Sequence, residues 1–66
     1  MRPPIERHEL QTGEVVIIQR FKHKYSCFTV SPIFGEPPEF HVESGSLSDC
    51  REALAAILES DVLDSI

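Results

Sequence analysis

Two cysteines and two histidines of this chain are of the types that ligate metals: Cys27, Cys50, His23 and His41. Two thiolates and two imidazoles form a set that binds Zn²⁺ tetrahedrally. Structural zinc sites take their ligands in close pairs, and here only His23 and Cys27 lie within four residues of each other. These two flank an expected turn, while Cys50 falls on the apolar stripe of an expected helix, where a small buried side chain is the simpler interpretation. We therefore predict no metal site and no cofactor.

A thiol beside an imidazole can also form a nucleophilic pair, and this sequence offers Cys27 with His41. Such a pair needs a third group that orients the imidazole and a pocket that excludes water. The strand and helix patterns of this sequence predict a three-stranded sheet with one helix, and such a fold has little concave surface to form a pocket of this kind. We therefore expect that the protein is not an enzyme.

A different chemistry is suggested by residues 20–25, which read Arg-Phe-Lys-His-Lys-Tyr. Cationic groups interleaved with rings can grip phosphates while a ring stacks on a base. The same residues also suit a solvated hairpin tip whose charges prevent aggregation of sheet edges. An acidic protein surface is an equally suitable ligand for such a tip. The residues predicted to bind a partner here are Arg20, Lys22, His23, Lys24 and Tyr25.

Charge is divided unequally along the chain, whose formal net charge is −5. Residues 1–35 hold five Lys or Arg against three acids, whereas residues 36–66 hold one against eight, so the two parts carry +2 and −7. Fields of opposite sign on one small body favour docking to a charged partner or to a second copy. The net charge argues against general nucleic-acid affinity, because phosphates repel a negative protein. Three acids lie where the dipole of the expected helix disfavours them and are also predicted to meet a partner: Glu59, Asp61 and Asp64.

The elements that position these residues follow from the hydrophobic pattern, and 66 residues allow a single domain. Residues 1–12 contain two prolines and are expected to form a flexible N-terminal arm. Strands are expected over residues 14–21, 25–33 and 39–43, where β-branched or alternating apolar residues suit a sheet. Ser46 with Asp49 approximates a capping box, which predicts a helix from there to about residues 60–63. Residues 13–66 are thus predicted to form one α+β domain, a three-stranded antiparallel meander with one C-terminal amphipathic helix on one face, in the order β-β-β-α.

The expected core joins sheet residues Phe28, Val30, Phe40 and Val42 to helix residues Leu47, Leu54, Ile57 and Leu58. The first strand can turn either Val15 and Ile17 or Val16 and Ile18 toward the helix, and the sequence leaves both arrangements open. In both, an apolar pair stays on the outer face beside Tyr25 and Cys27, although outer faces of antiparallel sheets are usually polar. We therefore predict that a second copy covers this face. The predicted dimer face comprises Val15, Ile17, Tyr25 and Cys27.

The stretch Gly45-Ser46-Leu47-Ser48-Asp49, followed by Glu52-Ala53-Leu54, resembles the helix start in the β-β-β-α module of HicB-type antitoxins. The resemblance covers roughly half of the chain. The Pro-x-x-Pro-Gly turn of that family is absent, and so is the DNA-binding tail that often follows the module. No residue roles are carried over. The resemblance implies a protein-binding role, as an acidic partner of a basic protein.

These patterns together predict a small acidic interaction or regulatory module that acts by binding another protein and forms a homodimer. The alternative is a nucleic-acid-binding accessory protein that uses the tip Arg20–Lys24. The N-terminus is polar, and no run approaches the ~20 apolar residues of a membrane span. We therefore expect a cytoplasmic protein that does not enter a membrane.

Overall fold

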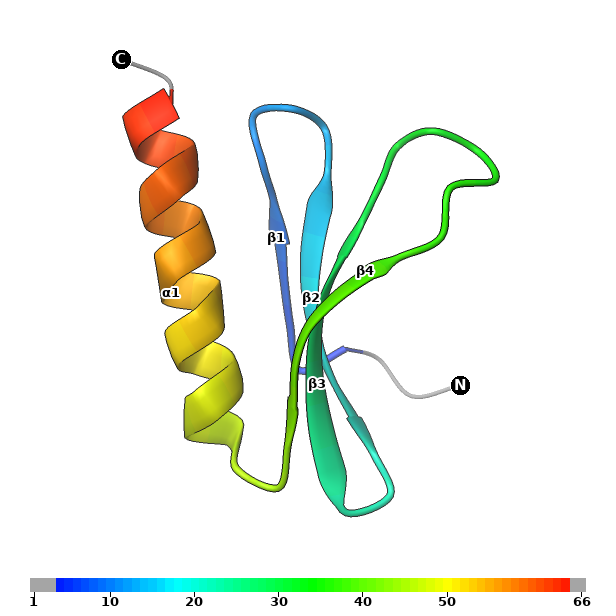
Figure 1. Cartoon of the computed structure of the whole chain (residues 1–66), viewed down its shortest axis with the longest axis vertical. Coiled ribbons are helices and arrows are strands. Elements are labelled where there is room, and N and C mark those ends of the chain that lie inside the picture. The colour runs from blue at the N-terminus through cyan, green and yellow to red at the C-terminus, as the bar shows by residue number, and fades with distance from the viewer. Residues whose placement is uncertain (1–3, 65–66) are drawn as a thin grey trace.

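Four antiparallel strands followed by one long helix make up the computed structural model, which describes residues 4–64 (Figure 1). The elements are β1 (Glu6–Glu9), β2 (Val15–Phe21), β3 (Lys24–Val30), β4 (Glu39–Ser44) and α1 (Leu47–Asp64). The strands lie in the sheet in their chain order, each antiparallel to the next. The predicted class, α+β with an antiparallel sheet and one C-terminal helix, is confirmed. The predicted number of three strands is wrong.

The additional strand is β1, which occupies part of the expected N-terminal arm. Glu6 pairs with Ile18 and Glu9 with Val15. The amide of Ile5 extends this pairing by donating to the Ile18 carbonyl at 2.9 Å. The sequence Glu-Arg-His-Glu has no apolar alternation to indicate a strand, so β1 is held by main-chain hydrogen bonds to the edge of β2. Strand pairing from Ile5 to Glu9 thus lies within the segment expected to be a flexible arm, and residues 1–3 of that segment lie outside the described residues.

Strands β2 and β3 form the predicted hairpin, with Phe21 paired to Lys24 across a two-residue turn of Lys22 and His23. Hairpins this tight require backbone conformations with positive φ, because those match the twist of the strands. Lys22 provides one, with a φ of 58°. The turn thus sets the register of the hairpin and displays both side chains at its tip.

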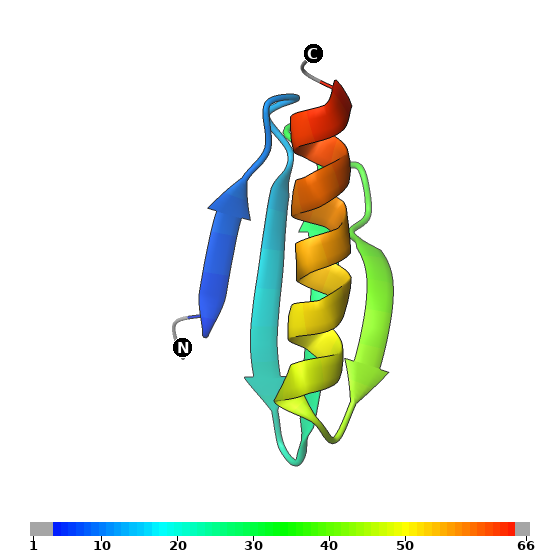
Figure 2. The ribbon, with the colours of Figure 1, turned by 90° about the vertical axis from the view of Figure 1, so that its left-hand side faces the viewer.

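Helix α1 lies across one face of the sheet, and no other element of residues 4–64 covers the opposite face (Figures 1 and 2). Five apolar residues are buried between the two layers: Val16, Ile18, Cys27, Cys50 and Leu54. The pair that faces the helix is therefore Val16 with Ile18. Because side chains alternate along a strand, Val15 and Ile17 lie on the opposite face, which we call the outer face.

A β-bulge in β4 overturns part of the predicted core. Cys27 pairs with Val42 and Phe28 with Phe40, so His41 is an extra residue between two paired positions. An extra residue reverses the alternation, so that Val42 packs against the core whereas Phe40 lies on the outer face. In β3 the helix-facing residues are Tyr25, Cys27 and Thr29. Phe28, Val30 and Phe40, predicted to be core residues, are outer-face residues.

The helix follows its predicted pattern closely. Leu47, Ala53, Ile57 and Leu58 pack against the buried cluster. The start of α1 is linked to the end of β4, because Ser44 Oγ donates to the Asp49 carboxylate at 2.6 Å and accepts from the Ser46 amide at 3.1 Å. The Asp49 carboxylate of the predicted capping box thus accepts from Ser44, while Ser46 Oγ shares a 2.8 Å hydrogen bond with Ser48 Oγ. No helix within residues 4–64 combines the length and the apolar character that a membrane crossing requires.

Candidate functional site

The outer face carries a continuous group of apolar side chains on three neighbouring strands. The register places Ile17, Phe28 and Phe40 in one row across the sheet, and Val15 beside Val30 in the next. At the β1 edge these rows end in Arg7, opposite Ile17, and Glu9, opposite Val15. We define the apolar patch as Val15, Ile17, Phe28, Val30 and Phe40.

Within this patch the two aromatic rings contact each other. The ring centroids of Phe28 and Phe40 lie 5.1 Å apart at an interplanar angle of 40°. Phe40 still leaves 60% of its surface exposed, while the other four members are half-buried. An apolar face of this kind is typical of a surface that docks to another macromolecule.

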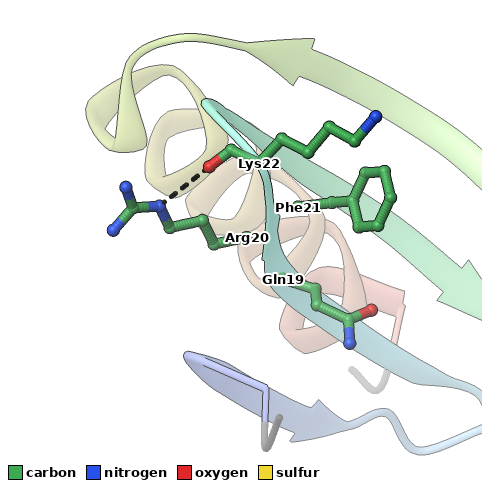
Figure 3. A pocket seen from close by; sticks show the side chains of 4 residues that line it. All are labelled: Gln19, Arg20, Phe21 and Lys22. Atoms are coloured by element: carbon green, nitrogen blue, oxygen red, sulfur yellow. Dashed lines mark hydrogen bonds between the residues drawn. The ribbon is translucent and has the colours of Figure 1, made fainter. Parts of the chain in front are cut away.

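The β2–β3 turn forms a basic tip at one end of the molecule (Figure 1). Figure 3 shows the side chains of Arg20, Phe21 and Lys22 there. Of the five Lys and Arg residues between positions 4 and 64, three lie here: Arg20, Lys22 and Lys24. Arg20 Nε donates to the Lys22 carbonyl at 3.2 Å, and its guanidinium lies 5.9 Å from the centroid of the Tyr25 ring. The Lys22 ammonium lies 5.4 Å from the centroid of the Phe21 ring. Arg20 is thus engaged within the chain, whereas Lys22 and the 71%-exposed Phe21 project at the tip.

A shallow groove of about 430 Å³ joins the basic tip to the apolar patch, with Phe21, Phe28, Phe40 and Glu43 among its lining residues. Lys24 Nζ lies 3.5 Å from the Glu43 carboxylate, so one tip cation has an acidic neighbour in the same molecule. This pairing reduces the positive field that the tip can offer to a phosphate.

The acidic residues predicted to bind a partner lie at the far end of the molecule from the basic tip. Glu59, Asp61 and Asp64 belong to the last turns of α1, which ends away from the β2–β3 turn along the 38 Å longest axis (Figure 1). The Asp61 carboxylate accepts from the Gln11 amide at 3.3 Å, and the Gln11 side chain donates to the Asp61 carbonyl at 3.1 Å. One of the three acids therefore fastens the β1–β2 loop to the helix.

Two members of the predicted dimer face lie on the opposite side of the sheet from the other two. Val15 and Ile17 are on the outer face as expected. Cys27 is buried in the core, and Tyr25 packs against the core from the helix side. The grouping of these four residues is therefore wrong, because the helix packs over the odd-numbered residues of β3.

The two free cysteines are both buried in the core. Burial raises the pKa of Cys27, and the nearby Cys50 adds to this rise. Burial likewise raises the pKa of Cys50, with a further contribution from Asp49. Thiols with raised pKa values stay protonated at neutral pH and are poor nucleophiles. Both side chains therefore behave as small hydrophobes.

The two histidines that the sequence suggested for a metal site or a nucleophilic pair lie in different parts of the structure. His41 Nε2 shares a 2.6 Å hydrogen bond with the hydroxyl of Thr29, whereas His23 is exposed at the basic tip. Among residues 4–64, no cluster of three or more His, Cys, Asp or Glu side chains could hold a metal ion. The four residues considered for zinc do not converge.

Sequence reasoning missed Phe28, Val30 and Phe40 as surface residues. Their apolar character was the available signal, and it assigned them to the core. Nothing in the local sequence marks His41 as the bulge that turns Phe40 outward. Nothing in it shows either that α1 packs over the other face of β3, which leaves Phe28 and Val30 on the outer face. Comparison with protein-family models found no match, and comparisons with curated proteins and with solved structures found no significant match either. The resemblance to HicB-type antitoxins is thus not supported by a family model.

Proposed function

We propose that this chain is a small acidic protein-interaction module that acts by binding another protein and assembles as a homodimer through its outer sheet face. The observation that carries the proposal is the apolar patch, which leaves aromatic surface in water on the side of the sheet opposite α1. Exposure of such a patch to water is unfavourable in a monomer, whereas binding to a protein partner would bury it and lower the free energy.

The small size of the core supports the same conclusion. Only five apolar residues of the described chain are buried, while five of its large exposed hydrophobic residues lie outside α1: Ile5, Phe21, Ile33, Phe34 and Phe40. A chain of this size buries about 60% of its unfolded surface by itself, less than larger domains do, and association is one of the ways in which small domains gain stability.

The test is the molar mass in solution at micromolar concentration, measured by sedimentation equilibrium. We expect the wild type to have twice the chain mass of 7.5 kDa. Phe40→Ser removes the most exposed ring of the patch and is expected to shift the mass to that of the monomer. The matched control is Leu63→Ser, because Leu63 is 61% exposed and lies on α1, on the other side of the sheet.

Circular dichroism of both variants shows whether the fold is kept. Should Phe40→Ser be unfolded, Ile17→Thr replaces it, because a β-branched residue is retained in the strand. A wild type that sediments as a monomer throughout this concentration range would contradict the homodimer.

Nucleic-acid binding by the basic tip is the second candidate function. It is favoured by the clustering of three cations beside the exposed Phe21 ring. Binding of a labelled single-stranded oligonucleotide that weakens steeply with salt would support it. Absence of binding at low salt would remove it.

A further inference from the structure

At each end of its strands the outer face is flanked by a charged residue and by exposed apolar side chains. The basic tip provides Lys22 and the exposed Phe21 at one end. At the other end the β3–β4 loop, residues 31–38, extends away from α1 on the side of the outer face (Figure 1). This loop carries Ile33, which is 64% exposed, Phe34, which is fully exposed, and Glu36.

The loop has internal hydrogen bonds that define its shape. Ser31 Oγ donates to the Glu36 carboxylate at 2.6 Å and accepts from the Ile33 amide at 3.1 Å, and the Glu36 amide donates to the Ile33 carbonyl at 3.3 Å. The acid and the two apolar side chains are therefore presented together. The tip presents the complementary set, a cation and an aromatic ring.

We propose that two copies pack their outer faces together with their strands running in opposite directions, so that the tip of each copy (Phe21, Lys22) contacts the β3–β4 loop of the other (Ile33, Phe34, Glu36). This inference rests on the proposed homodimer and specifies how its two copies are oriented. Opposite directions bring each basic tip to an acidic loop at both ends of the interface. The same direction would bring tip to tip and loop to loop, which places like charges together.

The arrangement also accounts for exposed residues that the apolar patch alone does not use. Two sheets packed face to face bury the central rows, here those of Ile17 with Phe28 and of Val15 with Val30. The apolar residues at the two ends, Phe21 and Phe34, then meet each other across the interface. A two-fold axis makes both contacts identical, so each charge pair occurs twice.

The experiment exchanges the two charges. Lys22→Glu changes the net charge from −5 to −7, and Glu36→Lys changes it from −5 to −3. Each variant alone places like charges at both ends of its own dimer, and we expect its dimer dissociation constant to rise by about tenfold. An equimolar mixture of the two variants restores both opposite-charge contacts, and the mixed dimer is expected to bind more tightly than the homodimer of either variant.

The control mixture combines Lys22→Glu with Glu59→Lys, whose net charge is also −3 but whose substitution lies on the last turns of α1. This mixture restores only one of the two contacts, so it is expected to bind more weakly than the charge-exchanged mixture. Circular dichroism establishes that each variant is folded, and Glu36→Lys, in the loop, gives a second test independent of the turn at Lys22.

The outcomes separate the inference from the proposed function. A wild-type monomer overturns the homodimer itself. If the wild type is a dimer and neither Lys22→Glu nor Glu36→Lys changes its dissociation constant, the opposed orientation alone is overturned. In a tip-to-tip dimer each substitution only replaces one contact between like charges by another. Equal affinities of the two mixtures would overturn it as well.

Discussion

At the scale of single residues, the contact that joins the first strand to the helix is an ion pair. Glu6 Oε2 accepts from Arg51 Nε at 2.9 Å, and Glu6 Oε1 lies 3.5 Å from His8 Nε2. The hydrogen bond from Arg51, together with the charges of Arg51 and His8, holds the pKa of Glu6 below its ordinary value of 4.5 against the opposing effect of burial. A charged Glu6 therefore helps to hold β1 in place.

The pH dependence of this contribution follows from its sign. Because the folded state lowers the pKa of Glu6, the stabilisation is present above pH 4.5 and is lost as the pH falls through the lowered value. Glu6→Gln is expected to reduce the free energy of unfolding by about 0.5 kcal/mol at neutral pH, the size typical of exposed pairs. Urea titrations at several pH values measure the difference, which should disappear in acid.

Glu9→Gln is the control for this substitution, since Glu9 belongs to the same strand but lies on the outer face opposite Val15. The free energy of unfolding of Glu9→Gln should not show the same loss between acid and neutral pH. If Glu6→Gln lowers the free energy of unfolding equally above and below the pKa of the Glu6 carboxyl, the loss does not come from the charge of Glu6.

At the scale of elements, the β4 bulge decides which side chains face the helix. His41 is the extra residue, and its ring shares a 2.6 Å hydrogen bond with Thr29, which is buried on the helix side of β3. The bond satisfies a buried hydroxyl and fixes the extra residue at one position. It therefore helps to hold Val42 against the core and Phe40 on the outer face.

A double-mutant cycle with Thr29→Val and His41→Ala measures this bond. Each single substitution is expected to lower the free energy of unfolding by about 1 kcal/mol, because it removes one partner of a part-buried hydrogen bond. The double variant should lose less than the sum of the two single losses. Purely additive losses, measured by urea denaturation, would indicate that the pair does not interact.

At the scale of the whole molecule, one helix and one thin sheet enclose few residues. The Cα extents are 38 × 27 × 16 Å, and the buried apolar cluster holds five side chains. A second copy placed on the outer face would turn two layers into four and would bury the apolar patch of each chain. Folding and association would then be linked, because a partner that binds only the folded state stabilises it.

Linkage of this kind makes thermal stability depend on protein concentration. A tenfold increase in concentration corresponds to about 1.4 kcal/mol, and for a dimer of this size we expect Tm to rise by roughly 5 °C. Differential scanning calorimetry over a range of concentrations measures this shift. Phe40→Ser should abolish the dependence and Leu63→Ser should retain it, whereas a wild-type Tm that is independent of concentration would contradict linked association.

The sequence by itself determined the features that depend on local pattern. Four consecutive β-branched residues predict β2, from Val15 to Ile18, and the helical spacing of Leu47, Cys50 and Leu54 predicts the buried side of α1. The division of charge along the chain likewise indicated the basic tip and an acidic remainder. Each of these signals lies within a few residues of the feature that it specifies.

Only the tertiary structure decided which face of the sheet is the core. Strands with apolar residues on both faces have no preferred side until the helix packs, and a shift of one residue reverses every assignment. The bulge at His41 and the pairing of β1 with β2 depend on contacts between segments distant in the chain. The bulge turned Phe40 outward, and the packing of α1 against Cys27 left Phe28 on the outer face. Together they formed the surface on which the proposed association depends.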